Sequence, residues 1–262
     1  MFEDSLLIVA HPDDDILWMG SVIDKVDAVI FCFNDDPGNP SVGKARQRTI
    51  KEYPLSNVST LDLNETQSWD KADWTHPDAS AYGIKIVKSL ESESRYQEAY
   101  EELLKVLRSR VAEAKNVFTH NPWGEYGHEE HVLVYRVLKA LQTEFHFDVW
   151  FSNYCSNRSV NFMNHFISGF DVVYESLPVN LPLVNEIAEI YRKNECWTWY
   201  EDYRWFESEC LIREKPGVLQ TEALPYGRSF PLNYIKIHVD SNPPGPDRFT
   251  QAISKLKRKL HI

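Results

Sequence analysis

The sequence has few cysteines, no long apolar run and no excess of positive charge, and each shortage excludes a class of protein. Its 262 residues contain four cysteines and no CxxC pair: Cys32, Cys155, Cys196 and Cys210. We expect these to be reduced thiols rather than a disulfide framework. No apolar run approaches the roughly 20 residues of a membrane span, so no membrane anchor is expected.

Charge and the N-terminal residues narrow the possible partners and location. The net charge of -11 argues against nucleic acid or an anionic membrane surface as a partner. Residues 1–4 are acidic in part and run straight into an apolar segment, unlike an ordinary secretory signal, so we expect a cytoplasmic protein. No linker, repeat or low-complexity segment divides the chain, which predicts a single domain over residues 1–262.

Strand-like and helix-like segments alternate along the first part of the chain. Short apolar runs predict strands at residues 6–10, 27–33, 58–63, 116–119 and 147–152, and helical spacing predicts helices at 16–26, 42–53, 94–114 and 132–141. This order is typical of an α/β, Rossmann-like domain with a mostly parallel sheet and helices on both faces. Later segments predict a strand at 171–175, a helix at 183–194, a strand at 233–239 and a basic terminal helix at 249–260.

A cluster of polar residues follows the first predicted strand. The sequence there is His11-Pro12-Asp13-Asp14-Asp15. One aspartate would serve as a helix N-cap, but three adjacent carboxylates repel one another unless a cation lies among them. In open α/β sheets, ligands bind beyond the carboxyl ends of the strands. The pattern therefore predicts a ligand or cation site at this turn.

A second cluster follows the strand predicted at residues 116–119. After a loop rich in glycine and proline, His128 and His131 are three residues apart at a helix start and share one face. Two histidines and a carboxylate from separate loops make an open three-ligand site, an arrangement that zinc uses in catalysis. Fe²⁺ and Mn²⁺ bind the same kinds of ligand and stay possible.

The two motifs together resemble those of the PIG-L/LmbE family of metal-dependent de-N-acetylases, over a motif-bearing core of residues 1–141, with residues 142–262 more variable. The resemblance implies an N-acetylated sugar or glycoconjugate, such as a GlcNAc derivative, as the substrate. It implies that His11, Asp14 and His131 bind Zn²⁺ and that Asp13 is the general base. It further implies that His128 stabilises the oxyanion or donates a proton and that Tyr126 helps to bind the transition state. Asp15 and Arg46 are the residues it implies for substrate binding.

Other functions stay open at this point. Acidic clusters at strand ends also hold Mg²⁺ or Mn²⁺ in glycosyltransferases, although no glycine-rich phosphate loop is present. The chain could instead be an amidase acting on a thiol conjugate, or a sugar-binding or scaffold protein that has lost catalysis. Specificity is expected to lie in the aromatic segments 64–83 and 197–206. Tryptophans of the first could stack on a sugar or simply fix the loop to the core.

Overall fold

The computed structural model describes residues 1–166, 172–214 and 231–237, and a central sheet organises them. Within these residues the sheet has seven strands in the order β3-β2-β1-β6-β7-β10-β9. The first five strands of this order are parallel, whereas β10 is antiparallel to both its neighbours. The strands are β1 (Ser5–Val9), β2 (Ala28–Asp35), β3 (Val58–Asn64), β6 (Asn116–Thr119), β7 (Asp148–Ser152), β9 (Val172–Pro178) and β10 (Ser208–Glu214).

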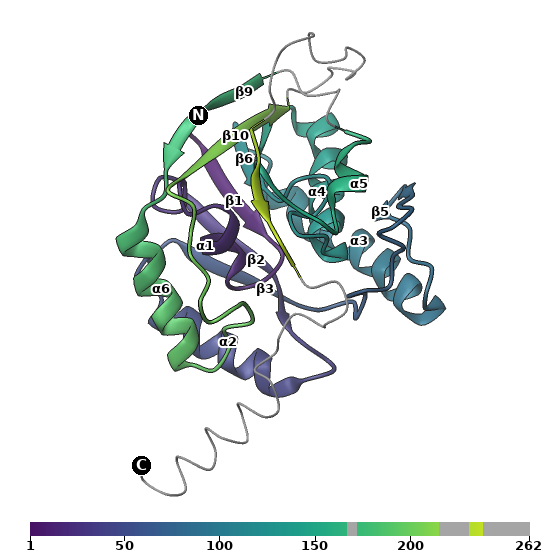
Figure 1. Ribbon diagram of the computed structural model, residues 1–262, viewed down its shortest axis with the longest axis horizontal. Helices are drawn as coiled ribbons and strands as arrows, with labels where there is room; N and C mark the ends of the chain where they lie inside the picture. Colours follow the sequence, from purple (N-terminus) through teal and green to yellow (C-terminus); the bar gives the residue numbers. More distant parts are fainter. Residues whose placement is uncertain (167–171, 215–230, 238–262) are drawn as a thin grey trace, which may run out of the picture.

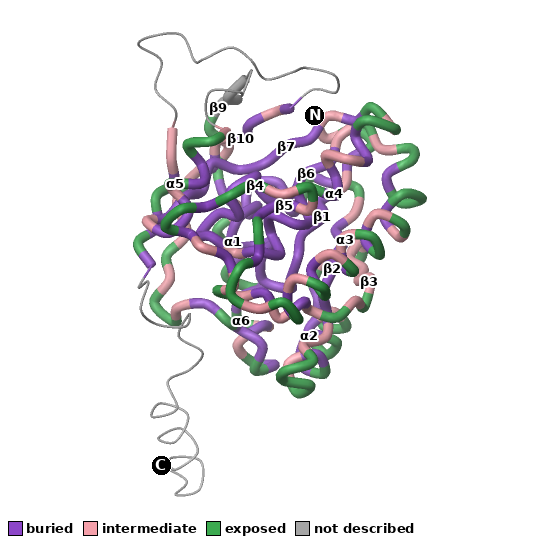
Figure 2. The backbone as a smooth tube through the Cα atoms, turned by 90° about the vertical axis from the view of Figure 1, so that its right-hand side faces the viewer, coloured by how far each residue is buried: buried purple, intermediate pink, exposed green. Residues whose placement is uncertain are grey.

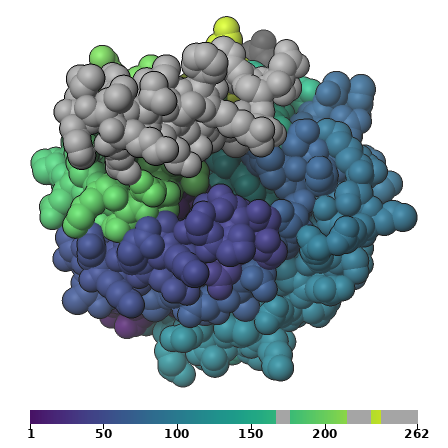
Figure 3. All heavy atoms as spheres, turned by 90° about the horizontal axis from the view of Figure 1, so that it is seen from below, coloured from purple at the N-terminus to yellow at the C-terminus, as the bar shows by residue number. Residues whose placement is uncertain are grey.

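Helices cover both faces of this sheet, as predicted (Figure 1). One group is α1 (Asp14–Trp18), α2 (Pro40–Glu52) and α6 (Leu181–Lys193), with α6 packed against the other two. Seen from below, the green surface of α6 lies beside the blue surface of α2 (Figure 3). The other group is α3 (Leu90–Arg110) and α4 (Glu129–Phe145), which pack together. Shorter elements are β4 (Ala79–Ser80), β5 (Gly83–Ile84), β8 (Tyr154–Ser156), α5 (Val160–Met163) and β11 (Asn233–Ile235). The mostly parallel α/β class is confirmed.

The core lies where the uninterrupted apolar runs predicted it. Leu7, Ile8 and Val9 of β1 have no exposed surface, because helices pack on both sides of the strand. The buried strands form the purple centre of the tube in Figure 2. All four cysteines are free thiols, as expected from their spacing.

The helix predicted over residues 16–26 is wrong beyond Trp18. Its apolar residues are buried, but residues 20–25 form turns rather than a helix. Two observations explain this. The backbone N–H groups of Gly20 and Ser21 donate to the carboxylate of Glu209, at 3.2 and 3.0 Å, instead of to helical carbonyls. Gly20 also has no room for a side chain, since a Cβ there would lie 2.9 Å from Val179.

Other elements follow their predictions apart from their ends. The strand predicted at 171–175 is β9, and the helix predicted at 183–194 is α6. The late strand is β11, shorter than the predicted 233–239, whose last two residues lie outside the described residues together with the helix predicted at 249–260. No sequence pattern predicted β10, which joins the C-terminal part of the chain to β7.

The sheet has its topological switch between β1 and β6. The chain adds β2 and β3 on one side of β1, then returns to place β6 and β7 on the other. Ile8 and Thr119 are register partners, so the two polar motifs leave adjacent parallel strands at the same edge. Ligands of open α/β sheets bind at such a point.

Candidate metal-dependent active site

The two motifs meet at this switch point. His11, Asp14 and His131 form a group whose potential ligand atoms all lie within 4.8 Å of one another. Asp14 is at its centre: His11 Nδ1 is 3.2 Å from one carboxylate oxygen, and His131 Nε2 is 3.1 Å from the other. All three side chains are buried. The structure thus brings together the three residues predicted as metal ligands.

The donor set fits a divalent cation because one of its atoms otherwise has no role. The Nδ1 atom of His131 lies 2.7 Å from Glu125, whose carboxylate can only accept, so Nδ1 carries the proton. The Nε2 lone pair then faces the carboxylate of Asp14. Among the described residues this buried Nε2 atom has no hydrogen-bond partner. A cation between the two acceptors removes the conflict.

Glu125 fixes the orientation of this histidine, and the sequence reasoning assigned it no role. Besides His131, its carboxylate accepts from the backbone N–H of Asn121 at 2.8 Å and lies 3.0 Å from His120 Nδ1. The opposite nitrogen of His120 accepts from the N–H of Ala10 at 2.8 Å, which ties the second loop to the end of β1. A carboxylate behind a metal-ligating histidine sets its tautomer and increases its basicity.

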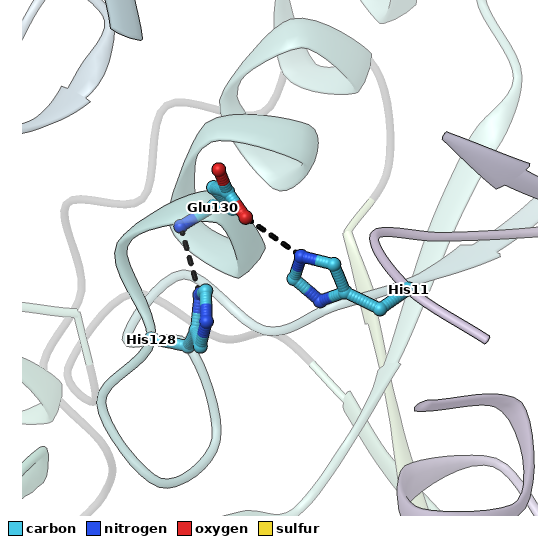
Figure 4. Close-up of side chains that lie close together, drawn as sticks. All are labelled: His11, His128 and Glu130. Atoms are coloured by element: carbon cyan, nitrogen blue, oxygen red, sulfur yellow. Dashed lines mark hydrogen bonds and ion pairs between the residues drawn. The ribbon is translucent and has the colours of Figure 1, made fainter. Parts of the chain in front are cut away.

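Glu130 does the same for the other histidine. Its carboxylate lies 2.6 Å from His11 Nε2, and its backbone N–H donates to His128 Nδ1 at 3.2 Å (Figure 4). Thr66 donates to the remaining carboxylate oxygen through both its hydroxyl, at 2.7 Å, and its backbone N–H. Because both oxygens of this carboxylate are hydrogen-bonded, Glu130 orients His11 and leaves Nδ1 facing Asp14. Glu125 and Glu130 could have been suspected from their place inside the Gly-Glu-Tyr-Gly-His-Glu-Glu-His run.

The electrostatics of the group favour a positive charge at its centre. Burial alone would raise the pKa of Asp14, but His131 and His120 hold it well below its usual range. Burial alone would lower the pKa of His11, but its contacts with Asp14 and Glu130 raise it to about 10. Both pKa shifts reflect the same arrangement of buried carboxylates and imidazoles: the carboxylates around His11 favour positive charge there, which either a proton or a bound cation can supply.

Asp13 lies beside the metal-ligand group without belonging to it. Its backbone is in the left-handed region, with φ of 107°, a conformation unfavourable for a residue other than glycine. Thr198 donates to its carboxylate through its hydroxyl at 2.6 Å. Burial and the adjacent Asp14 carboxylate raise the pKa of Asp13 to about 7. A carboxylate that titrates near neutrality can both accept and return a proton.

His128 occupies the mouth of the same site, with its ring centroid 4.9 Å from that of His11 and 4.7 Å from that of His131. Its surroundings do not favour the charged form of the imidazole. Burial, with the nearby His131 and His11, holds its pKa well below the usual value, so it is neutral at pH 7. Since its Nδ1 accepts from the backbone, its proton is on Nε2. His128 is therefore a neutral hydrogen-bond donor.

A cleft of roughly 190 Å³ opens beside these residues. Tyr126 lines it, stacked on Trp18 at 5.4 Å between ring centroids and in edge contact with Trp199 at 4.7 Å. Arg46 also lines it and donates to Glu65 at 2.6 Å. The lining residues are His11, Asp13, Asp14, Leu17, Asp36, Val42, Arg46, Glu65, Trp69, Tyr126, His128, Thr198 and Trp199. All the predicted site residues except Asp15 and His131, which are fully buried, reach the cleft.

Asp15 is not in a position to bind substrate, contrary to the sequence-based expectation. It has no exposed surface and accepts hydrogen bonds from the hydroxyl groups of Tyr53 and, at 3.1 Å, Tyr191. Its other contact is the backbone N–H of Asp13, at 3.2 Å. Burial raises its pKa to about 6. Asp15 therefore supports the turn that holds Asp13, from behind the cleft.

The two tryptophans of segment 64–83 have different roles. Trp74 is buried and donates its indole N–H to Glu129 at 3.0 Å, which fixes the loop to the start of α4. Trp69 lines the cleft and lies over His128, with ring centroids 4.9 Å apart, while Arg158 covers it at 4.5 Å. Trp74 therefore fixes the loop to the core, whereas Trp69 presents an aromatic ring to the cleft.

The sequence matches one family profile, and the fold is similar to that of several solved structures. The profile of the PIG-L family, described as GlcNAc-PI de-N-acetylase, matches residues 6–141. A solved structure of the zinc-inhibited form of teicoplanin deacetylase Orf2 is similar, with a TM-score of 0.50 and 12% identity over 80% of this chain and 97% of that one. A deacetylase–teicoplanin complex has a TM-score of 0.48 and 12% identity over 80% and 97%. A conserved protein from Thermus thermophilus has 0.42 and 13% over 86% and 99%. Comparison with curated proteins gives no significant sequence match.

The fold and the site define an α/β protein with a buried His-Asp-His group, at the switch point of its sheet, that could hold a metal ion. The matched profile spans more than half of the chain and includes both motifs. The chain therefore belongs to the PIG-L family. Among the described residues, no helix combines the length and the apolar character that crossing a membrane requires.

Proposed function

We propose that this protein is a zinc-dependent hydrolase that removes the acetyl group from an N-acetylated amino sugar of the GlcNAc type. The observation that carries the proposal is the buried His11–Asp14–His131 group, in which an imidazole nitrogen with no hydrogen-bond partner among the described residues faces a carboxylate, with Asp13 and His128 beside it. The family and the deacetylase neighbours support amide hydrolysis as the class of reaction. The continuous sheet supports a single domain over the whole chain.

His11, Asp14 and His131 would hold the metal. A divalent ion bound there would lower the pKa of water to about 7 and polarise the acyl carbonyl. Asp13 acts as the general base, because its carboxylate lines the cleft and its pKa of about 7 suits proton acceptance at neutral pH. The same group then returns the proton to the leaving amine.

His128 and Tyr126 stabilise the negative charge that develops on the acyl oxygen. His128 donates through Nε2–H, as derived above, and needs no positive charge to do so. Burial, and to a smaller extent the negative charge of Asp14, raise the pKa of the Tyr126 phenol well above its usual value. Its hydroxyl therefore stays protonated and able to donate. Since leaving the acyl oxygen unbonded costs more in a buried site than in water, two donors suit this step.

The cleft also suits a sugar. Trp69 and Trp199 provide aromatic surface for the apolar face of a pyranose, and Asp36 and Glu65 provide carboxylate acceptors for hydroxyl groups. Arg46 lines the same cleft, paired with Glu65, and would contact the substrate there. A mixed aromatic and carboxylate lining is what a neutral polyol needs.

The test is metal analysis of the purified protein together with assay of released acetate. The panel should include N-acetylglucosamine, N-acetylated glycoconjugates, thiol conjugates and a nucleotide sugar. We expect about one zinc per chain and acetate release, with an equal amount of free amine, from an acetamido sugar. Bound metal without hydrolysis of any panel member would contradict the proposal and favour a binding protein. Transfer from the nucleotide sugar would favour a glycosyltransferase.

A further inference from the structure

We propose that Thr198 is a positioning residue that holds the carboxylate of Asp13 in its working orientation. Its hydroxyl donates to Asp13 Oδ2 at 2.6 Å, and its backbone N–H points to the same oxygen at 3.4 Å. Among the described residues, both donors to this carboxylate come from Thr198. The inference rests on the general-base role proposed above for Asp13. Thr198 lies beyond the part of the chain that the family profile matches.

Asp13 needs such a contact because its position is otherwise set only through its backbone. Its φ of 107° is held by Asp15, which accepts from the Asp13 N–H at 3.2 Å. That contact fixes the main chain but leaves the side-chain torsions free. Thr198 binds Oδ2 and so leaves Oδ1 to accept a proton. General-base catalysis depends on such placement, because a shift of about 1 Å can cost about 100-fold in rate.

The segment that carries Thr198 is held firmly against the site. The chain turns sharply after α6 at Glu195, which has φ of 64°, and Cys196 N–H donates to Tyr191 at 3.1 Å. Both neighbours of Thr198 are buried tryptophans, whereas Thr198 itself is exposed and lines the cleft.

Two contacts join this segment to α1, the helix that follows Asp13. The Trp199 ring meets that of Trp18 edge-on at 5.2 Å, and the indole N–H of Trp205 donates to the Ile16 carbonyl at 2.7 Å. The donor and its acceptor therefore belong to one rigid unit, although 185 residues separate them. A threonine at the cleft rim with no such anchorage would be free to rotate away.

The experiment compares Thr198→Val and Thr198→Ser in the full-length, metal-loaded protein, with N-acetylglucosamine as the substrate. Valine keeps the shape but lacks the hydroxyl, and serine keeps the hydroxyl. We expect the valine variant to lose about 10- to 100-fold in kcat with KM and metal content unchanged. The serine variant should recover most of that loss. Thr143→Val, which removes an exposed hydroxyl near the end of α4, is the matched control and should match the wild type.

A double-mutant comparison separates positioning from other roles. In an Asp13→Ala background, Thr198→Val should have no further effect, because the group it positions is gone. Independent effects that multiply, a rise in KM at constant kcat, or full activity of the valine variant would each overturn the inference. If the wild type releases acetate from no panel member, the proposed function fails instead. A crystal structure then decides on Thr198: an Oγ1–Asp13 distance above 3.5 Å would overturn the contact itself.

Discussion

Replacing Glu125 with glutamine should weaken metal binding without changing the shape of the site. The Glu125 carboxylate accepts from His131 Nδ1, His120 Nδ1 and the Asn121 N–H, at 2.7, 3.0 and 2.8 Å. A glutamine has one acceptor oxygen and one donor NH₂. If its oxygen takes the backbone N–H, its NH₂ faces the two imidazoles. His131 must then accept at Nδ1 and carry its proton on Nε2, the atom that faces Asp14.

The magnitude follows from what that tautomer change removes. A metal ligand must offer a lone pair, and loss of an orienting carboxylate typically costs about 10- to 100-fold in metal affinity, or about 1.4 to 2.8 kcal/mol. We expect the glutamine variant to lie at or beyond the upper end, because burial leaves no water to substitute for the lost acceptor. The opposite amide orientation places the NH₂ group against the Asn121 N–H, so that two donors face each other, and is therefore also unfavourable.

The assay is titration of the metal-free protein with Zn²⁺ against a competing chelator, with circular dichroism to check the fold. Glu98→Gln, on the exposed side of α3, is the control and should bind zinc like the wild type. If Glu125→Gln binds zinc as tightly as the wild type while folded, the assignment of His131 Nε2 as a ligand atom is refuted.

Three further predictions follow from the same geometry. Asp13→Ala should keep the metal and lose at least about 100-fold in kcat, the usual scale for a general base, and near-wild-type turnover would remove Asp13 from the mechanism. His131→Ala should lose the metal, which elemental analysis can check; full zinc occupancy would contradict it. Glu209→Gln should change how stability depends on pH, because burial raises the pKa of this carboxyl from 4.5 to about 7. A folded-state pKa above the unfolded value means that ionisation disfavours the folded state, so the wild type should lose up to about 3 kcal/mol between pH 4.5 and 7, while the glutamine variant should not show this loss. Parallel urea denaturation of both proteins across that range measures the difference, and identical pH profiles would show that Glu209 does not titrate on unfolding.

The sequence by itself determined the framework of the protein and the location of its chemistry. Continuous apolar runs identified β1 and β2, because a strand covered on both faces carries mostly apolar residues. The order of strands and helices predicted a parallel sheet, and the two polar motifs at strand ends predicted that the turn after His11 and the turn at His128 and His131 would meet; the resemblance to the family singled out His11, Asp14 and His131 among them. These predictions depend on local patterns, which burial and turn chemistry dictate within a few residues.

Only the tertiary structure decided which partners those motif residues have. Glu209, which lies on the distant strand β10, accepts hydrogen bonds from the backbone N–H groups of Gly20 and Ser21, and the helix ends after Trp18. Local residue spacing does not reveal such a contact. Asp15 carries the same side chain as its neighbours, yet it faces two tyrosines behind the cleft rather than substrate. Thr198 reaches Asp13 because α6 and β10 pack beside the core. Periodicity records which side chains are buried, whereas the choice of hydrogen-bond partner depends on which distant elements pack together.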